Sequence, residues 1–149
     1  MGRIQVGILG MGRLGASIGL ALKRATKSNP RQEFIITGYD SSGESAAAAQ
    51  KRGALDTTAG SPAEAAAEKE IVVMALPYAD VREGYRQIGG VIKEGAVILD
   101  FSPLALPSMG WSKQFMKPGA HMVALTAILN PEYLFDGLDD LDHAAEDLF

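Results

Sequence analysis

Three glycines between an apolar run and an alanine-rich segment constrain the fold most. The run at 4–9 is short, apolar and β-branched, which predicts a buried strand. Residues 13–27 carry apolar side chains at helical spacing, which predicts a helix. Gly10, Gly12 and Gly15 lie at this junction, so the chain is expected to turn sharply from a strand into a helix there.

The same alternation of elements continues along the chain. Further strands are expected at 33–40, 71–76, 96–101 and 121–128, and further helices at 44–53, from Ser61 onward, at 80–92 and at 109–117. Strands that are apolar throughout are buried on both faces, and alternating helices join them by right-handed crossovers. The expected fold class is α/β, with a Rossmann-type, doubly wound, mainly parallel sheet.

Each glycine has a distinct expected role in such a junction. Gly10 allows the turn out of the strand, Gly12 lets a pyrophosphate approach the main chain, and Gly15 lets the helix pack on the strand. The helix begins at Arg13 and Leu14, where its N–H groups and dipole favour a phosphate. We therefore expect a dinucleotide site in this loop. The alternative is an ordinary glycine-rich helix start.

An acidic residue at the end of the second strand supports a dinucleotide site. Asp40 lies 25 residues after Gly15, where a carboxylate accepts hydrogen bonds from the ribose hydroxyls of NAD and repels the 2′-phosphate of NADP. NAD is therefore the expected cofactor, unless Asp40 is simply a turn residue. NADP stays open, because Ser41 and Ser42 can bond a phosphate and Arg13 can pair with one.

Ligands of such sheets bind beyond the carboxyl ends of the strands. The apolar turn Leu76-Pro77 ends one strand and is expected to line the ribose and nicotinamide. Ser102, Thr126 and Asn130 follow two later strands and are the catalytic candidates. Each also has a structural interpretation: a turn or helix cap for Ser102, a strand residue for Thr126 and a pre-proline turn for Asn130.

Composition and charge exclude several other classes of protein. The sequence has no cysteine, which removes disulfides, thiolate metal sites and cysteine nucleophiles and is compatible with the cytoplasm. The net charge of −4 gives no general attraction for nucleic acid. No apolar run approaches the ~18 residues of a membrane span. We expect a cytoplasmic protein with a small-molecule substrate and no metal, nucleic-acid or membrane partner.

The acidic residues are concentrated at one end of the sequence. Residues 130–149 hold seven of them and no lysine or arginine, which leaves +3 on the remainder (14 basic against 11 acidic residues). Such a segment is usually a solvated face. Four apolar residues recur in it at helical spacing: Leu138, Leu141, Ala145 and Leu148. We expect a dinucleotide-binding domain at 1–130 and, at 131–149, an acidic linker or helix start that leads to a helical domain outside this chain.

Five stretches together resemble the nucleotide-binding domain of the prephenate and arogenate dehydrogenase family: VGILGMGRLGASIGLAL, ITGYD, RGALD, IVVMALPYADV and AVILDFSPL. The resemblance implies a cytoplasmic, homodimeric, NAD(P)-dependent enzyme whose dimer forms through a second, helical domain. In that family a hydride leaves the carbon that bears a ring hydroxyl, and decarboxylation makes the product aromatic. The resemblance also implies that Gly10, Gly12, Gly15 and Asp40 bind the cofactor.

The catalytic motifs of that family are altered in this chain. The family usually has Gly-His-Pro where this chain reads MVALTAILNP, so the proton-accepting histidine falls at Thr126. The family usually has Asp-x-x-Ser-x-Lys where this chain reads DFSPLA, with Ser102 one place early and no lysine. The two histidines present, His121 and His143, are expected to be structural or solvated.

These departures leave several functions open. We expect a divergent NAD(P)-dependent oxidoreductase that transfers a hydride between nicotinamide and a small carboxylated substrate, and that is inactive as this chain alone. The alternatives are a dinucleotide-binding module without catalysis and an imine or β-hydroxyacid dehydrogenase.

Overall fold

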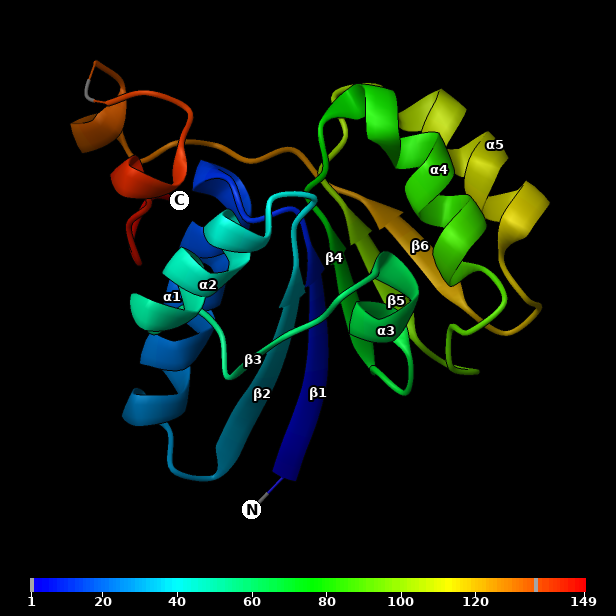
Figure 1. Ribbon diagram of the computed structural model, residues 1–149, viewed down its shortest axis with the longest axis horizontal. Helices are drawn as coiled ribbons and strands as arrows, with labels where there is room; N and C mark the ends of the chain where they lie inside the picture. Colours follow the sequence, from blue (N-terminus) through cyan, green and yellow to red (C-terminus); the bar gives the residue numbers. More distant parts are fainter. Residues whose placement is uncertain (1, 136) are drawn as a thin grey trace.

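A parallel sheet of six strands forms the centre of the computed structural model, which describes residues 2–135 and 137–149 (Figure 1). The strands are β1 (Gly2–Leu9), β2 (Gln32–Tyr39), β3 (Thr57–Thr58), β4 (Ile71–Met74), β5 (Val97–Asp100) and β6 (His121–Ala124). The α-helices are α1 (Arg13–Ser28), α2 (Gly43–Lys51), α3 (Pro62–Ala66), α4 (Tyr78–Ile88) and α5 (Ala105–Phe115). Within these described residues, no helix has the length and apolar character needed to cross a bilayer.

The strand order is β3-β2-β1-β4-β5-β6, and every pairing is parallel. The chain first builds outward from β1 through β2 to β3, then returns to the other edge of β1 and continues from β4 to β6. Successive crossovers therefore run in opposite directions on the two sides of β1. In open α/β sheets this reversal leaves a crevice at the carboxyl ends of the strands, where ligands bind.

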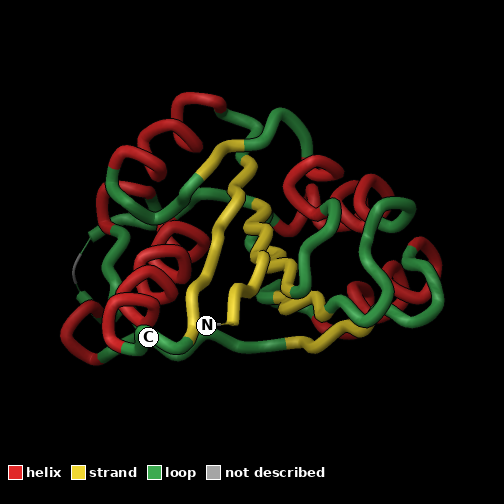
Figure 2. Tube along the Cα trace, turned by 90° about the horizontal axis from the view of Figure 1, so that it is seen from below, coloured by secondary structure: helices red, strands yellow, loops and turns green. Residues whose placement is uncertain are grey.

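Helices cover both faces of the sheet (Figure 2). On one face, Ile8 and Ile36 belong to an apolar cluster that also includes residues of α1 and α2. On the other face, Val72 belongs to a cluster that includes Val81 and Tyr85 of α4 and residues of α3. Burial on both faces explains why the strands carry unbroken apolar runs. The expected Rossmann-type fold is confirmed.

Several element boundaries differ from the expectation: β4 ends at Met74 instead of residue 76, and α4 spans Tyr78–Ile88 instead of 80–92. Two further differences have a structural reason. The sequence predicts the last strand at 121–128, but β6 ends at Ala124, because its partner β5 ends at Asp100. The N–H of Leu125 makes the last bond, to the carbonyl of Asp100, and beyond it the chain has no neighbouring strand to pair with. The helix expected at 109–117 begins earlier, at Ala105, and a proline in its first turn is tolerated there.

The apolar spacing near the C-terminus does not produce an α-helix. The described residues 137–149 contain only a single 3-10 turn, η2 (Leu141–His143), and a similar turn, η1 (Pro131–Tyr133), precedes them. Leu148 and Ala144 are nevertheless buried, and Ala144 belongs to the cluster that also holds Ala16 of α1. The helical expectation is wrong because packing on α1, rather than local periodicity, determines the backbone of this segment. The expected domain boundary at residue 130 stays a prediction.

Candidate functional site

The loop between β1 and α1 needs glycine at two positions for steric reasons. Gly10 adopts φ +96°, a conformation that L side chains rarely take, and a Cβ there would collide with the carbonyl of Ala75. A Cβ at Gly15 would collide with the carbonyl of Gly10. The first glycine therefore allows the turn and the last allows α1 to pack against it, as the sequence predicts.

Gly12 is different, because the space beside it is open. A Cβ at this position would meet no atom within 4 Å, so the protein itself does not require a glycine there. Gly12 is also the N-cap of α1, and it makes no side-chain cap for the helix. The first turn of α1 contains no acidic residue. An uncapped helix start beside bare main chain is a favourable place for a phosphate group.

Asp40 lies directly against this loop. Its Oδ2 accepts a hydrogen bond from the N–H of Met11 (2.7 Å), and its Oδ1 accepts one from the N–H of Ser42 (2.8 Å). A carboxylate offers about four acceptor positions, so lone pairs remain for ribose hydroxyls. The structure thus fixes this carboxylate beside the helix start to which the pyrophosphate is expected to bind.

Two pockets meet at Asp40. One, of about 340 Å³, is lined by the glycine loop, Arg13, Leu14, Leu76 and Pro77. The other, of about 350 Å³, shares Asp40 and the Leu76-Pro77 turn with the first and continues past Ser41 along α4. Every residue expected to bind the cofactor except the buried Gly15 lines one of these two pockets: Gly10, Gly12, Arg13, Leu14, Asp40, Ser41, Leu76 and Pro77.

The chain after β6 crosses above the carboxyl ends of the strands and returns to α1 and α2 (Figure 1). Residues 137–149, which we call the C-terminal segment, are held there by hydrogen bonds. Arg52 donates to the carbonyls of Leu141 (2.8 Å) and Ala144 (3.2 Å), and the N–H of Ala145 donates to Ser17 Oγ (2.9 Å). Asp139 of this segment lines the pocket at the glycine loop.

None of the three catalytic candidates is among the described residues that line the two pockets. The N–H of Ser102 donates to Asp100 Oδ1 (2.7 Å), which is a turn arrangement, and the buried Ser102 Oγ has no partner among the described residues. The side chain of Asn130 caps η1 and donates to the carbonyl of Asp147 (3.1 Å). Thr126 is exposed in the stretch after β6. Their catalytic roles stay predictions.

A buried polar pair that the sequence did not predict lies below the end of β5. The hydroxyl of Tyr85 donates to Asp100 Oδ2 (2.6 Å), and both residues are almost fully buried. Burial, reinforced by the hydrogen bond to Asp100, raises the pKa of Tyr85. Helical spacing places Tyr85 on the buried face of α4, but no local signal identifies its partner. The pair ties α4 to the strand end from which Ser102 follows.

The two histidines differ in their position relative to the candidate site: the main chain of His143 lies beside it, because Arg13 Nε donates to the carbonyl of His143 (3.0 Å), whereas His121 lies at the far end of β6. His121 is exposed at the first residue of β6, the end of the strand opposite the glycine loop. His143 Nδ1 is 2.6 Å from Asp140 Oδ1 in the C-terminal segment. Neither histidine is among the described residues lining the two pockets at Asp40.

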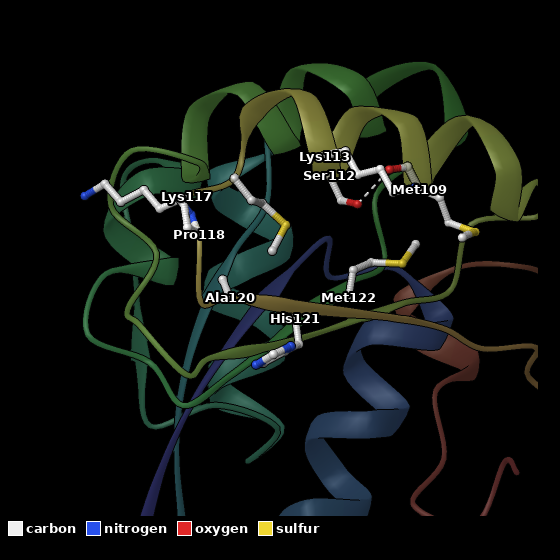
Figure 3. Close-up of a pocket in the computed structure, with 9 residues that line it drawn as sticks. Met109, Ser112, Lys113, Lys117, Pro118, Ala120, His121 and Met122 are labelled. Carbon is white, nitrogen blue, oxygen red and sulfur yellow. Dashed lines mark hydrogen bonds between the residues drawn. The ribbon is translucent and has the colours of Figure 1, made fainter.

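A third pocket, of about 440 Å³, lies between α5 and the edge strand β6 (Figure 3). Met109 and Met122 point into it, whereas His121 points to the opposite side of the strand. The hydroxyl of Ser112 is occupied by a hydrogen bond to the carbonyl of Met109 (2.9 Å). The described residues that line this pocket include none of those around Asp40, so it is separate from the candidate site.

The solved structures that are similar to this chain include three enzymes with high coverage of its residues. Prephenate dehydrogenase from A. aeolicus, in complex with hydroxyphenyl propionate and NAD+, matches 99% of this chain and 48% of its own chain, with 19% identity and a TM-score of 0.79. Arogenate dehydrogenase from Synechocystis matches 98% of this chain and 47% of its own, with 15% identity and a TM-score of 0.79. An imine reductase from Pseudomonas sp. matches 89% of this chain and 44% of its own, with 18% identity and a TM-score of 0.69.

These TM-scores establish a shared fold, and the expected resemblance to the nucleotide-binding domain of prephenate and arogenate dehydrogenases is confirmed at that level. The chain spans about half the length of the structures it matches. No curated protein matches the sequence. The family described as "NADP oxidoreductase coenzyme F420-dependent" matches residues 5–103, about two thirds of the chain. This family, together with the NAD+-bound neighbour, supports NAD(P) as the cofactor. The chain therefore belongs to the family of NADP oxidoreductases described as coenzyme F420-dependent.

Proposed function

We propose that this chain is the NAD-binding domain of a dehydrogenase. The observation that carries the proposal is the contact between Asp40 and the glycine loop, because it sets a carboxylate beside an uncapped helix start. A diphosphate binds at a helix start, and the adenosine ribose next to it binds a carboxylate. The hydrogen bond between Met11 and Asp40 holds these two groups side by side. The open space at Gly12 gives the diphosphate room to reach the main chain.

The residues present fit the parts of NAD in order. The pocket along α4, next to Ser41, would hold the adenosine, and Asp40 would accept hydrogen bonds from its ribose hydroxyls. The pocket at Gly12 and Arg13 would hold the pyrophosphate. The apolar Leu76-Pro77 turn would shelter the nicotinamide ribose from water. When bound, the nicotinamide ring supplies the hydride-transfer chemistry.

NAD rather than NADP is the cofactor we propose. A 2′-phosphate at the adenosine ribose would face the carboxylate of Asp40, and like charges at hydrogen-bonding distance oppose binding. Ser41 and Ser42 are exposed and can donate hydrogen bonds, but they carry no positive charge. The N–H of Ser42 is already used by Asp40.

In this proposal, substrate binding and catalysis require a protein longer than this chain. The structures with this fold are about twice as long as this chain. We infer that a second, helical domain follows residue ~150, forms a homodimer and closes over a small carboxylated substrate. Catalysis needs the substrate held against the nicotinamide in a closed site. This chain alone is therefore expected to bind NAD without turnover.

A second candidate is a dinucleotide-binding module without catalysis. It is favoured by the absence of histidine among the described residues that line the pockets at Asp40. Thr126, at the position where the resemblance places the catalytic histidine, cannot accept a proton near neutral pH. Hydride transfer by a longer form of the protein would exclude this candidate.

Calorimetric titration with NAD tests the proposal. The wild type should bind NAD, and Gly12→Val should abolish binding without loss of folding, because the new side chain enters space that only the ligand needs. Gly110→Val is the matched control, since a Cβ at Gly110 in α5 also meets open space but lies outside both pockets. Equal affinity of wild type and Gly12→Val for NAD would refute the proposal.

A further inference from the structure

Acidic residues of the C-terminal segment lie beside Ser42, close to the proposed position of the adenosine ribose. NAD and NADP differ at this ribose, because only NADP has a 2′-phosphate there. A pocket of about 350 Å³ lies between the start of α2 and this segment. Ser42 and Glu44 line it from α2, and Asp140 and Asp142 line it from the C-terminal segment. Ser42 is also the residue whose N–H is bonded to Asp40. The loop that would meet the adenosine ribose therefore faces three further carboxylates.

Hydrogen bonds and a buried side chain hold the carboxylates of the C-terminal segment in position. Arg52, at the end of α2, donates to the carbonyls of Leu141 and Ala144, on both sides of Asp142. Leu148 is buried and anchors the far end of the segment. Asp140 accepts hydrogen bonds from the main-chain N–H (3.1 Å) and the ring of His143. The ring hydrogen bond lowers the pKa of Asp140, so this group is ionised at neutral pH.

The charge arrangement opposes an anion that the local backbone would otherwise attract. The N-terminus of α2 would favour a phosphate beside Ser41 and Ser42. Glu44, Asp140 and Asp142 line the pocket at that helix start. Arg52 donates to carbonyls of the segment and its Nη1 is also 3.6 Å from Asp142 Oδ1, so it offsets part of the charge of Asp142. Three carboxylates against one arginine still leave net negative charge at the pocket. NAD presents neutral hydroxyls here, whereas NADP presents a 2′-phosphate. The penalty therefore applies to NADP alone.

We infer that the C-terminal segment is part of the cofactor specificity site: Asp140 and Asp142 act with Glu44 to exclude the 2′-phosphate of NADP. The inference rests on the proposed NAD site. In this inference the acidic segment contributes to the preference for NAD over NADP. Asp40, at the end of β2, is then not the only residue that determines this preference. The segment is distant in sequence from β2 and is brought to this loop only by the fold.

The test is the ratio of the NADP and NAD dissociation constants in the double variant Asp140→Asn, Asp142→Asn. Asparagine retains an oxygen that can accept the N–H of His143, so the segment should stay folded. At an ionic strength of about 0.01 M, repulsion between a phosphate and two carboxylates at roughly 8–10 Å predicts about tenfold tighter NADP binding in the double variant, and screening reduces this to about threefold at about 0.15 M. The dissociation constant for NAD should change less than about twofold, because neutral hydroxyls do not feel this repulsion.

Glu146→Gln is the matched control, since this carboxylate belongs to the same segment and, like Asp142, has an arginine beside it (3.7 Å to Arg24, against 3.6 Å from Asp142 to Arg52), but it does not line the pocket at Ser42. It should leave the ratio unchanged. If the wild type and the double variant bind NAD but have the same ratio, the inference is overturned. If the wild type binds neither dinucleotide, the proposed function fails, and this inference fails with it.

Discussion

Replacing Tyr85 by phenylalanine tests the buried pair at the end of β5 and gives a pH-dependent result. The ring would stay in the core, and only the hydroxyl that donates to Asp100 would be lost. Hydrogen bonds to charged groups contribute about 1.5–3 kcal/mol, and this one is short and buried, so we expect a loss of about 2 kcal/mol near neutral pH.

The sign of the pH dependence follows from the raised pKa of Tyr85. In the unfolded chain the phenol ionises near pH ~10, whereas in the folded protein it stays protonated at higher pH. Its contribution is therefore fully present below about pH 10 and falls by about 1.4 kcal/mol for each further pH unit. Because the phenylalanine ring of the variant cannot ionise, the stability difference between wild type and variant should vanish near pH ~11.5.

Urea denaturation of both proteins at a series of pH values measures this difference. Tyr78→Phe is the control, because Tyr78 contacts Trp111 through its ring (centroids 5.9 Å apart) and its hydroxyl has no hydrogen bond to the described residues. That variant should have nearly wild-type stability at neutral pH. A difference for Tyr85→Phe that stays constant from about pH 8 to about pH 11 would show that the folded state does not suppress ionisation of this phenol, and would refute the reasoning.

Three further predictions concern the loop and the C-terminal segment. Gly15→Ala should destabilise the protein by more than about 2 kcal/mol in urea denaturation, because its Cβ meets the carbonyl of Gly10, whereas Gly12→Ala should change stability by less than about 0.5 kcal/mol; equal effects would contradict the roles assigned to the glycines. Leu148→Ala should cost about 2–3 kcal/mol in the same assay if the C-terminal segment is part of the fold, and no loss would show that it is not. Asp40→Ala should weaken NAD binding about 10- to 100-fold by calorimetry, and unchanged affinity would exclude a ribose contact.

The glycine loop could be predicted from sequence because each requirement there is local. A strand, a turn with positive φ and a helix follow one another within a few residues, and Gly10 and Gly15 each answer a steric demand set by nearby main chain. The position of Asp40 followed from the same logic, since β2 must end beside β1 in a parallel sheet. Its hydrogen bond to Met11 added a contact that the spacing alone did not specify.

The path of the C-terminal segment and the pairing of Tyr85 with Asp100 depend on contacts between residues far apart in the sequence. The periodicity of apolar residues does not predict such contacts. The C-terminal segment has apolar residues at helical spacing, yet a hydrogen bond between Ser17 and Ala145, 128 residues apart, helps to fix it in an extended path over α1. The partnership of Tyr85 and Asp100 likewise arises because α4 crosses from β4 to β5 and places a helix residue over a strand end.

The most direct test of the central claim is a crystal structure of this chain with NAD. It should show the diphosphate against the main chain of Gly12 at the start of α1, and both hydroxyls of the adenosine ribose within hydrogen-bonding distance of the Asp40 carboxylate. A structure with NAD bound elsewhere, for example in the pocket between α5 and β6, or with the adenosine ribose turned away from Asp40, would contradict the claim.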